Sequence, residues 1–306
     1  MRYNKFALFS AAAAALLATP ASAHRQWMLP STTVLSGTQG GVTVDAAISN
    51  DLFDPDHFPM GLDEVAVWAP DGSKQQIQNP ATGRFKSTFD VMVDKPGTWK
   101  IGTEQSSMSG TFTLDGETWR VGGRRRPPAS AAGQGGPAGG RPAPARPAGA
   151  GGPGGFNPAH MVATVEEIPA NANDVKLSER VSRHFVFVTA DAPTEGVFAP
   201  TGKGLEMQPI THPSGLVADE EGQFRYLIDG KPAAGVAVTV VPGAKKFREA
   251  EDAQELKTGA DGILHVKWPV PGMYWMSASA SDNHPSDSRA SARSMTYTTT
   301  VEVVAP

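Results

Sequence analysis

Residues 229–241 read DGKPAAGVAVTVV and residues 258–280 read TGADGILHVKWPVPGMYWMSASA, and these two stretches decide the fold class. The first contains a run rich in Val, and the second contains short runs with Val, Tyr and Trp; Gly, Pro and Asp flank these runs. β-branched and aromatic residues favour strands, whereas Gly, Pro and Asp favour turns, so both stretches predict a strand, a turn and another strand. Leu264 and Val266 alternate with His265, which predicts one buried and one solvent-facing side of that strand.

The same pattern continues through most of the chain. Further runs that predict strands are GGVTVDAAIS (40–49), EVAVWAPDG (64–72), RFKSTFDVMV (84–93), GTWKIGT (97–103), GTFTLDG (110–116), VSRHFVFVTA (181–190), LEMQPI (205–210), QFRYLIDG (223–230) and MTYTTTVEVV (295–304). The one candidate helix, KKFREAEDAQELK at 245–257, is so highly charged that we expect a solvated excursion between strands instead. Six or seven short strands in about 100 residues are typical of a β-sandwich. We therefore predict an all-β protein with two immunoglobulin-like β-sandwich domains.

A low-complexity stretch at 122–155, GGRRRPPASAAGQGGPAGGRPAPARPAGAGGPGG, interrupts the strand pattern. It contains no apolar residue larger than Ala or Pro, so it is unable to bury enough surface to offset chain entropy and is predicted to be disordered. We interpret it as a spacer, and the alternative is an Arg-rich tether to anionic lipid or polysaccharide. The predicted organisation is a signal peptide at 1–23, a first β-sandwich domain at 24–121 plus 159–192, a disordered insertion at 122–158, a linker at 193–203 and a second β-sandwich domain at 204–306.

The first residues have the pattern of a secretory signal peptide. Arg2 and Lys5 precede an apolar run at 6–18, and small residues at 21–23 provide a cleavage site. The apolar run is too short to cross a membrane as a helix, so no membrane span is expected. We therefore predict a soluble periplasmic or secreted protein whose mature chain begins at His24.

Composition narrows the classes of function. The formal net charge is −4, which disfavours nucleic acid as a partner and is compatible with cations. The absence of cysteine excludes disulfides and a lipid-modified N-terminal Cys. The sequence has no Gly-x-Ser-x-Gly motif and no phosphate-binding loop, and adjacent carboxylates such as Glu166 and Glu167 are typical of solvated surface. We therefore expect a protein that is not an enzyme.

The stretches at 229–241 and 258–280 resemble carboxypeptidase-regulatory-like and prealbumin-like domains. Together with LEMQPITHP at 205–213 and AHRQWMLPS at 23–31, they make the chain similar to an uncharacterised bacterial periplasmic family labelled NikM-like. That resemblance implies a β-sandwich fold and a link to nickel and cobalt uptake. It does not cover the Gly/Pro/Arg-rich insertion, and such sandwiches host many functions.

A histidine at the mature N-terminus has a special metal-binding chemistry. Once cleavage exposes His24, its α-amine and its ring nitrogen are available to the same ion, and the amine proton is readily displaced near neutral pH. Nitrogen ligands of this kind suit Cu(II) and Ni(II), with Co(II) also suggested by the family label. The candidates for further ligands are His57, with Asp54 and Asp56 beside it, and His184 on a predicted strand.

The leading hypothesis is therefore a noncatalytic periplasmic protein that binds or delivers a divalent transition metal through His24. Its partner would be an outer-membrane receptor or a metal transporter, and the second domain would mediate docking. The principal alternative is a metal-free envelope module that recognises a protein or a glycan, and a third is an oxidative copper enzyme. The metal hypothesis requires His24 to lie within reach of a second imidazole.

Overall fold

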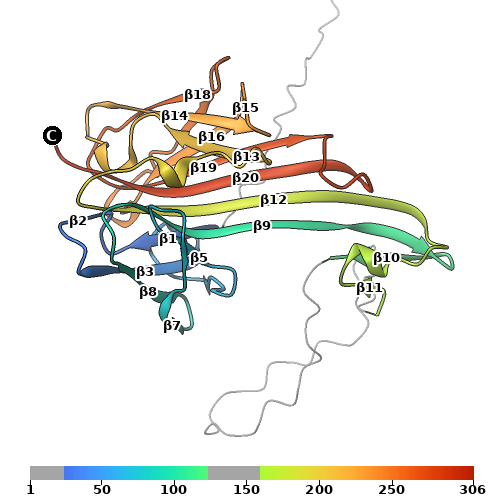
Figure 1. Ribbon diagram of the computed structural model, residues 1–306. Coiled ribbons are helices and arrows are strands. Elements are labelled where there is room, and N and C mark those ends of the chain that lie inside the picture. The colour runs from blue at the N-terminus through green and yellow to red at the C-terminus, as the bar shows by residue number, and fades with distance from the viewer. Residues whose placement is uncertain (1–23, 123–158) are drawn as a thin grey trace, which may run out of the picture.

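The computed structural model describes residues 24–122 and 159–306 (Figure 1). The predicted signal peptide and nearly all of the predicted insertion lie outside these residues. The described part is almost entirely β-structure, and its helical segments are single 3₁₀ turns: η1 (Val165–Glu167), η2 (Gly196–Phe198), η3 (Pro213–Gly215) and η4 (Lys245–Phe247). The prediction of an all-β fold is therefore confirmed.

The strands form three sheets. The first sheet has the order β1 (Arg25–Pro30), β3 (Gly40–Ser49), β8 (Ser87–Val93) and β7 (Gln78–Thr82), with β4 (Phe58–Pro59) paired to β3. The middle sheet has the order β11 (Met161–Val162), β10 (Glu117–Val121), β9 (Gly97–Leu114), β12 (Asn173–Ala190), β20 (Ala290–Val303), β19 (Gly272–Asp282), β16 (Ala237–Pro242) and β17 (Gln254–Lys257), with β2 (Val34–Leu35), β5 (Ala66–Trp68) and β6 (Lys74–Gln75) attached. The third sheet contains β13 (Leu205–Pro209), β14 (Glu221–Ile228), β15 (Lys231–Pro232) and β18 (Ile263–Lys267).

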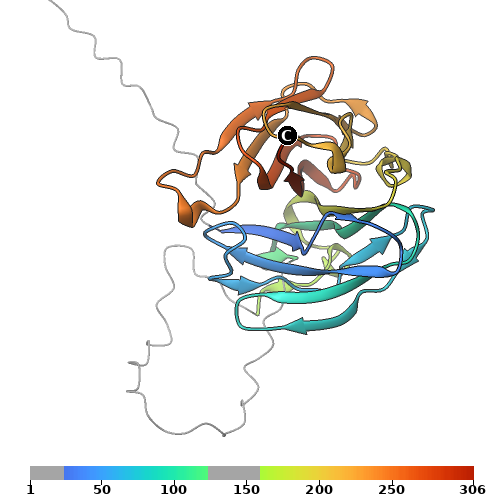
Figure 2. The ribbon, with the colours of Figure 1, turned by 90° about the vertical axis from the view of Figure 1, so that its left-hand side faces the viewer.

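The middle sheet is shared by both halves of the molecule. Strand β12 is antiparallel to β9 and parallel to β20, so the sheet continues from the N-terminal half into the C-terminal half. Because side chains alternate along a strand, Val186 and Val188 of β12 belong to the core under the first sheet, whereas Phe185 and Phe187 belong to the core under the third sheet. Figure 2 shows the two halves stacked on either side of this layer. The predicted sandwiches are confirmed, and they share one sheet.

Two large apolar cores hold the three sheets together. The core between the first and middle sheets includes Met28, Val44, Phe89, Trp99 and Ile101. The core between the middle and third sheets includes Phe224, Tyr226, Leu264, Trp268 and Tyr274. His265 and Lys267 point away from the second core, as the alternation predicted. The predicted linker adds Val197 and Phe198 to this core, and the domain boundaries themselves stay a prediction.

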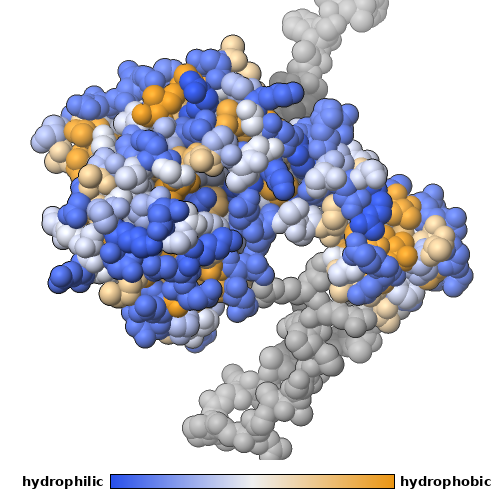
Figure 3. Space-filling model, viewed as in Figure 1, coloured by the Kyte–Doolittle hydropathy of each residue, from blue (hydrophilic) through white to orange (hydrophobic). Residues whose placement is uncertain are grey.

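Strands β9 and β12 extend past the two sandwiches into a separate lobe (Figures 1 and 3). The sequence predicted two short strands here, at 97–103 and 110–116, but the polar residues between them pair with β12 and make β9 one strand of 18 residues. A small apolar cluster that includes Phe112, Val121 and Leu177 holds the far end. Local polarity misled the prediction because the pairing of these residues comes from β12, a strand distant in sequence.

The candidate helix at 245–257 forms only the turn η4 and the strand β17. This agrees with the expected excursion between strands. Within residues 24–122 and 159–306, no helix is long and apolar enough to cross a membrane.

Candidate functional site

The start of β1 is held in place by the C-terminal half of the molecule. The indole Nε1 of Trp275 donates a hydrogen bond to the Gln26 carbonyl oxygen at 3.0 Å. The Arg25 guanidinium lies 5.3 Å from the centre of the Trp275 ring and forms an ion pair with Glu251. These contacts fix the backbone directly after His24, whose side chain is exposed.

The structure brings His24 and His57 together. Strand β3 pairs with β1 on one side and with β4 on the other, which returns the chain before Phe58 to the neighbourhood of β1. The His24 and His57 rings stack with centroids 3.8 Å apart and planes inclined by 24°. Phe58 packs against His57 with its ring centroid 4.1 Å away. The second imidazole that the metal hypothesis requires therefore lies beside His24.

The two candidate carboxylates make other contacts. Asp56 accepts hydrogen bonds from the backbone N of Asn50 at 3.0 Å and from its Nδ2 at 2.9 Å, and the side-chain bond holds the pKa of Asp56 below its usual range. Asp54 pairs with Lys246 at 3.3 Å. Within residues 24–122 and 159–306, no three side chains of His, Cys, Asp or Glu come together in a way that could hold a metal ion.

His184 lies in the middle of β12, on the side that faces a large groove. It is only 5% exposed, and neither ring nitrogen has a hydrogen-bond partner within the protein. Burial lowers the pKa of His184 to about 3, so the ring is neutral at physiological pH. His24 also lines this groove, which has a volume of about 1250 Å³. The roles of His184, Asp54 and Asp56 as metal ligands stay predictions.

The groove has a polar floor that the sequence analysis did not single out. Its side chains come from the face of the middle sheet that the first sheet leaves uncovered, and they include Thr103, Ser182, Thr239, Ser277, Thr296 and Thr298. The sequence signal is the alternation of hydroxyl residues in SASAS at 277–281 and TYT at 296–298. In the sequence these residues were interpreted only as strand formers. The pairing of the strands shows that they form one surface.

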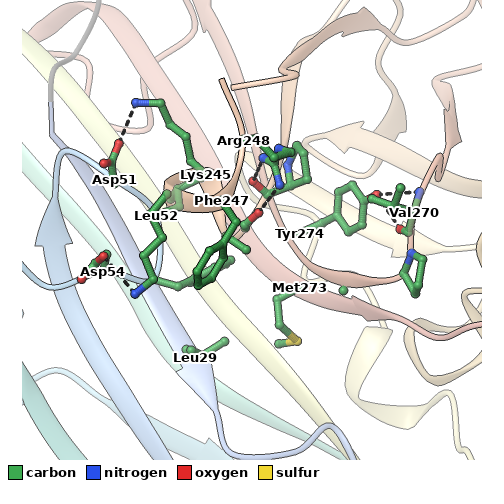
Figure 4. Close-up of a pocket in the computed structure, with 17 residues that line it drawn as sticks. Leu29, Asp51, Leu52, Asp54, Lys245, Phe247, Arg248, Val270, Met273 and Tyr274 are labelled. Carbon is green, nitrogen blue, oxygen red and sulfur yellow. Dashed lines mark hydrogen bonds and ion pairs between the residues drawn. The ribbon is translucent and has the colours of Figure 1, made fainter. Parts of the chain in front are cut away.

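A second concavity, of about 310 Å³, lies between the two halves (Figure 4). Leu29, Leu52 and Met273 are among the apolar residues that line it. Two ion pairs cross its rim, Lys245 with Asp51 at 2.9 Å and Lys246 with Asp54 at 3.3 Å. Phe247, which is 79% exposed, stands beside the opening. This pocket is apolar inside, unlike the groove beside His24.

Three further histidines make contacts of their own in other parts of the fold. His160 stacks on Trp119 in the lobe at the end of β9, with centroids 4.8 Å apart. The ring nitrogens of His212 lie within hydrogen-bond distance of Thr98 and Ser214. His265 Nδ1 lies 2.8 Å from Glu221 on the surface.

A family model described as a domain of unknown function (DUF4198) matches residues 21–282. Its description assigns no metal and no activity. No curated protein matches the chain. Among solved structures, the D0-D1 domain of intimin is 10% identical, and the match covers 90% of this chain and 97% of that chain with a TM-score of 0.18. That score is too low to carry an argument about fold or function.

Proposed function

The chain belongs to the DUF4198 family of domains of unknown function, and we propose that it is a noncatalytic periplasmic binding protein that holds a divalent transition metal at His24 and His57. The observation that carries this proposal is the stacking of the two imidazoles, with centroids 3.8 Å apart. The two residues directly precede β1 and β4, which both pair with β3, so the fold itself creates their proximity.

The ligand set is three nitrogens from two residues. Cleavage after Ala23 makes His24 the first residue, whose α-amine and ring then chelate one ion, and His57 supplies the third nitrogen. A free α-amine has a pKa of about 7.7–8.0, so a metal displaces its proton at neutral pH. Because the amine is not a side chain, this set is consistent with the lack of a three-residue cluster in the described part of the chain.

Metal binding requires a small change in the ring geometry. An ion lies in the plane of the imidazole that binds it, so at least one of the stacked rings must turn before both nitrogens point at the same ion. His24 is exposed and His57 is only partly buried, which leaves room for this rotation. Nitrogen ligands suit Cu(II), Ni(II) and Co(II), and the general order of affinities favours copper.

The proposed role is uptake or delivery of the ion at the cell envelope. Under this proposal the signal peptide exports the protein, and the C-terminal half docks to an outer-membrane receptor or a metal transporter. The acidic net charge of −4 favours the approach of cations.

Calorimetric titration with Cu(II) and Ni(II) tests the proposal. We expect the chain that begins at His24 to bind copper more tightly than a chain with one extra residue before His24, because that residue removes the amine chelate. His57→Ala should also weaken binding by at least about tenfold, equivalent to about 1.4 kcal/mol. His265→Ala is the matched control, since His265 lies on β18 and contacts Glu221 instead. Equal affinity in the extended chain would overturn the proposed chelate.

A further inference from the structure

We propose that the groove beside His24 is a second binding site, which takes a neutral oligosaccharide. We call it the hydroxyl groove and define its floor by Thr103, Gln105, Ser182, His184, Thr239, Ser277, Ser279, Thr296 and Thr298. This proposal goes beyond metal binding and does not depend on it.

One row of the floor crosses six neighbouring strands, and each strand contributes one polar side chain. Strand pairing aligns Thr103 of β9 with His184 of β12, and His184 with Thr298 of β20. The same row continues to Ser277 of β19, Thr239 of β16 and Glu255 of β17. Directly paired residues lie on the same face of a sheet, so all six side chains point into the groove. The register therefore places polar groups side by side across the sheet.

A second row lies two residues along the strands. It aligns Gln105 with Ser182, Ser182 with Thr296, and Thr296 with Ser279. Neighbouring strands are about 4.8 Å apart, so six strands span about 24 Å. The groove volume of about 1250 Å³ exceeds the roughly 300–1,000 Å³ typical of small-molecule sites. These dimensions suit an extended oligomer.

His184 has hydrogen-bonding groups that the protein itself does not satisfy. Its two ring nitrogens are buried and have no partner within the protein, and such groups cost free energy unless they are hydrogen-bonded. A neutral imidazole has one donor and one acceptor. A sugar hydroxyl can act as either. Both ring nitrogens are closed off from solvent, so a hydroxyl reaches one of them only when a neighbouring side chain of the floor turns aside.

The charges around the floor favour a neutral ligand. The charged residues that line the groove are Arg25, Arg180, Arg183 and Glu255. Arg25 forms an ion pair with Glu251 and Arg183 with Glu104, and Arg180 and Glu255 carry opposite charges on different strands. The row between Thr103 and Thr239 carries no charged side chain. The floor hydroxyls can donate and accept, as sugar hydroxyls do; Ser277 Oγ and Thr298 Oγ1, for example, lie 3.3 Å apart.

The floor of the groove is a sheet face, which favours a glycan over a peptide. The edge strand β1 also lines the groove through Arg25 and Gln26, but the Gln26 carbonyl oxygen already accepts a hydrogen bond from Trp275. Extended peptides bind sheets through the free backbone groups of an edge strand. Here β12, β20, β19 and β16 each pair with strands on both sides, so only their side chains face the groove. Trp275 lies at one end of the floor, where Arg25 covers its ring.

The test is an NMR titration of the mature chain with chitohexaose, cellohexaose and maltohexaose, in the presence of EDTA so that metal plays no part. We expect at least one of these oligosaccharides to shift the amide signals of Thr103, His184 and Thr298. Thr298→Val removes one floor hydroxyl but keeps the shape and the strand preference, and it should weaken binding about tenfold. Thr113→Val, on β9 outside the groove, is the matched control and should bind normally.

Any one of several outcomes would overturn the proposal. The first is that none of the three oligosaccharides shifts any amide signal, and the second is that the shifted signals belong to residues outside the groove. The third is that Thr298→Val binds the oligosaccharide as tightly as the wild type. Binding of an extended polar peptide at these residues without any saccharide binding would also contradict it. Because the titration excludes metal, a negative result would not contradict metal binding by His24 and His57, which the calorimetric titration tests separately.

Discussion

Trp275 Nε1 donates a hydrogen bond to the carbonyl oxygen of Gln26 at 3.0 Å, and this bond ties β19 to β1, the strand that begins directly after His24. Arg25 lies over the same indole ring. The position of His24 beside His57 therefore depends on the C-terminal half of the molecule as well as on the first sheet.

Trp275→Phe should reduce the free energy of unfolding by about 1–2 kcal/mol, because it removes this bond and leaves the Gln26 carbonyl without its donor. Chemical denaturation measures the change. Trp119→Phe, in the lobe at the end of β9, is the control for loss of an indole elsewhere. An unchanged stability in Trp275→Phe would show that the contact does not anchor β1.

Gly102→Ala should destabilise the protein by more than about 2 kcal/mol. Gly102 has a φ of 153°, and a Cβ there would come within 1.9 Å of the His184 carbonyl oxygen, so β9 would have to move away from β12. Gly40→Ala is the control, since a Cβ at Gly40 meets nothing within 4 Å. Thermal unfolding of both variants distinguishes the two sites, and similar melting temperatures would contradict the described packing.

The protein should become less stable as the pH is lowered, because of the buried His184. Its pKa is lowered from 6.5 to about 3 in the folded state, so the unfolded chain binds a proton that the folded chain excludes. This contribution to stability is present above pH 6.5 and is lost as pH falls toward 3. His184→Gln removes the titration and should reduce the loss of stability between about pH 7 and pH 5 by about 2 kcal/mol.

Urea denaturation of the wild type and of His184→Gln at both pH values provides the measurement. Circular dichroism at neutral pH establishes first that His184→Gln is folded. The same pH dependence in both proteins would mean that the pKa of His184 is the same in the folded and unfolded chains, which contradicts its burial.

Local sequence pattern predicted the strands well. The run GGVTVDAAIS at 40–49 coincides with β3, and the alternation around His265 gave the correct buried face. The continuity of β9 through 104–109 was missed because polar residues there resemble a turn and gain their pairing from β12. The shared middle sheet was also missed, since the pairing of His184 with Thr298 depends on contacts far apart in the chain.

The candidate site was predictable only in part. The signal-peptide pattern indicated His24 as the first residue of the mature chain, and the chelate chemistry suggested His57 as one of several candidates for a further ligand. No local signal places these two rings together, because their contact depends on the pairing of β3 with both β1 and β4. The hydroxyl groove depends on register in the same way, so its residues looked like ordinary strand formers in the sequence.

Electron paramagnetic resonance of the Cu(II) complex tests the central claim most directly, because nitrogen ligands split the copper signal. The chain that begins at His24 should show hyperfine couplings of similar size from three nitrogens, two of His24 and one of His57. His57→Ala should show two, and one extra residue before His24 should change the spectrum again. Identical spectra for the wild type and His57→Ala would contradict a metal site shared by the stacked histidines.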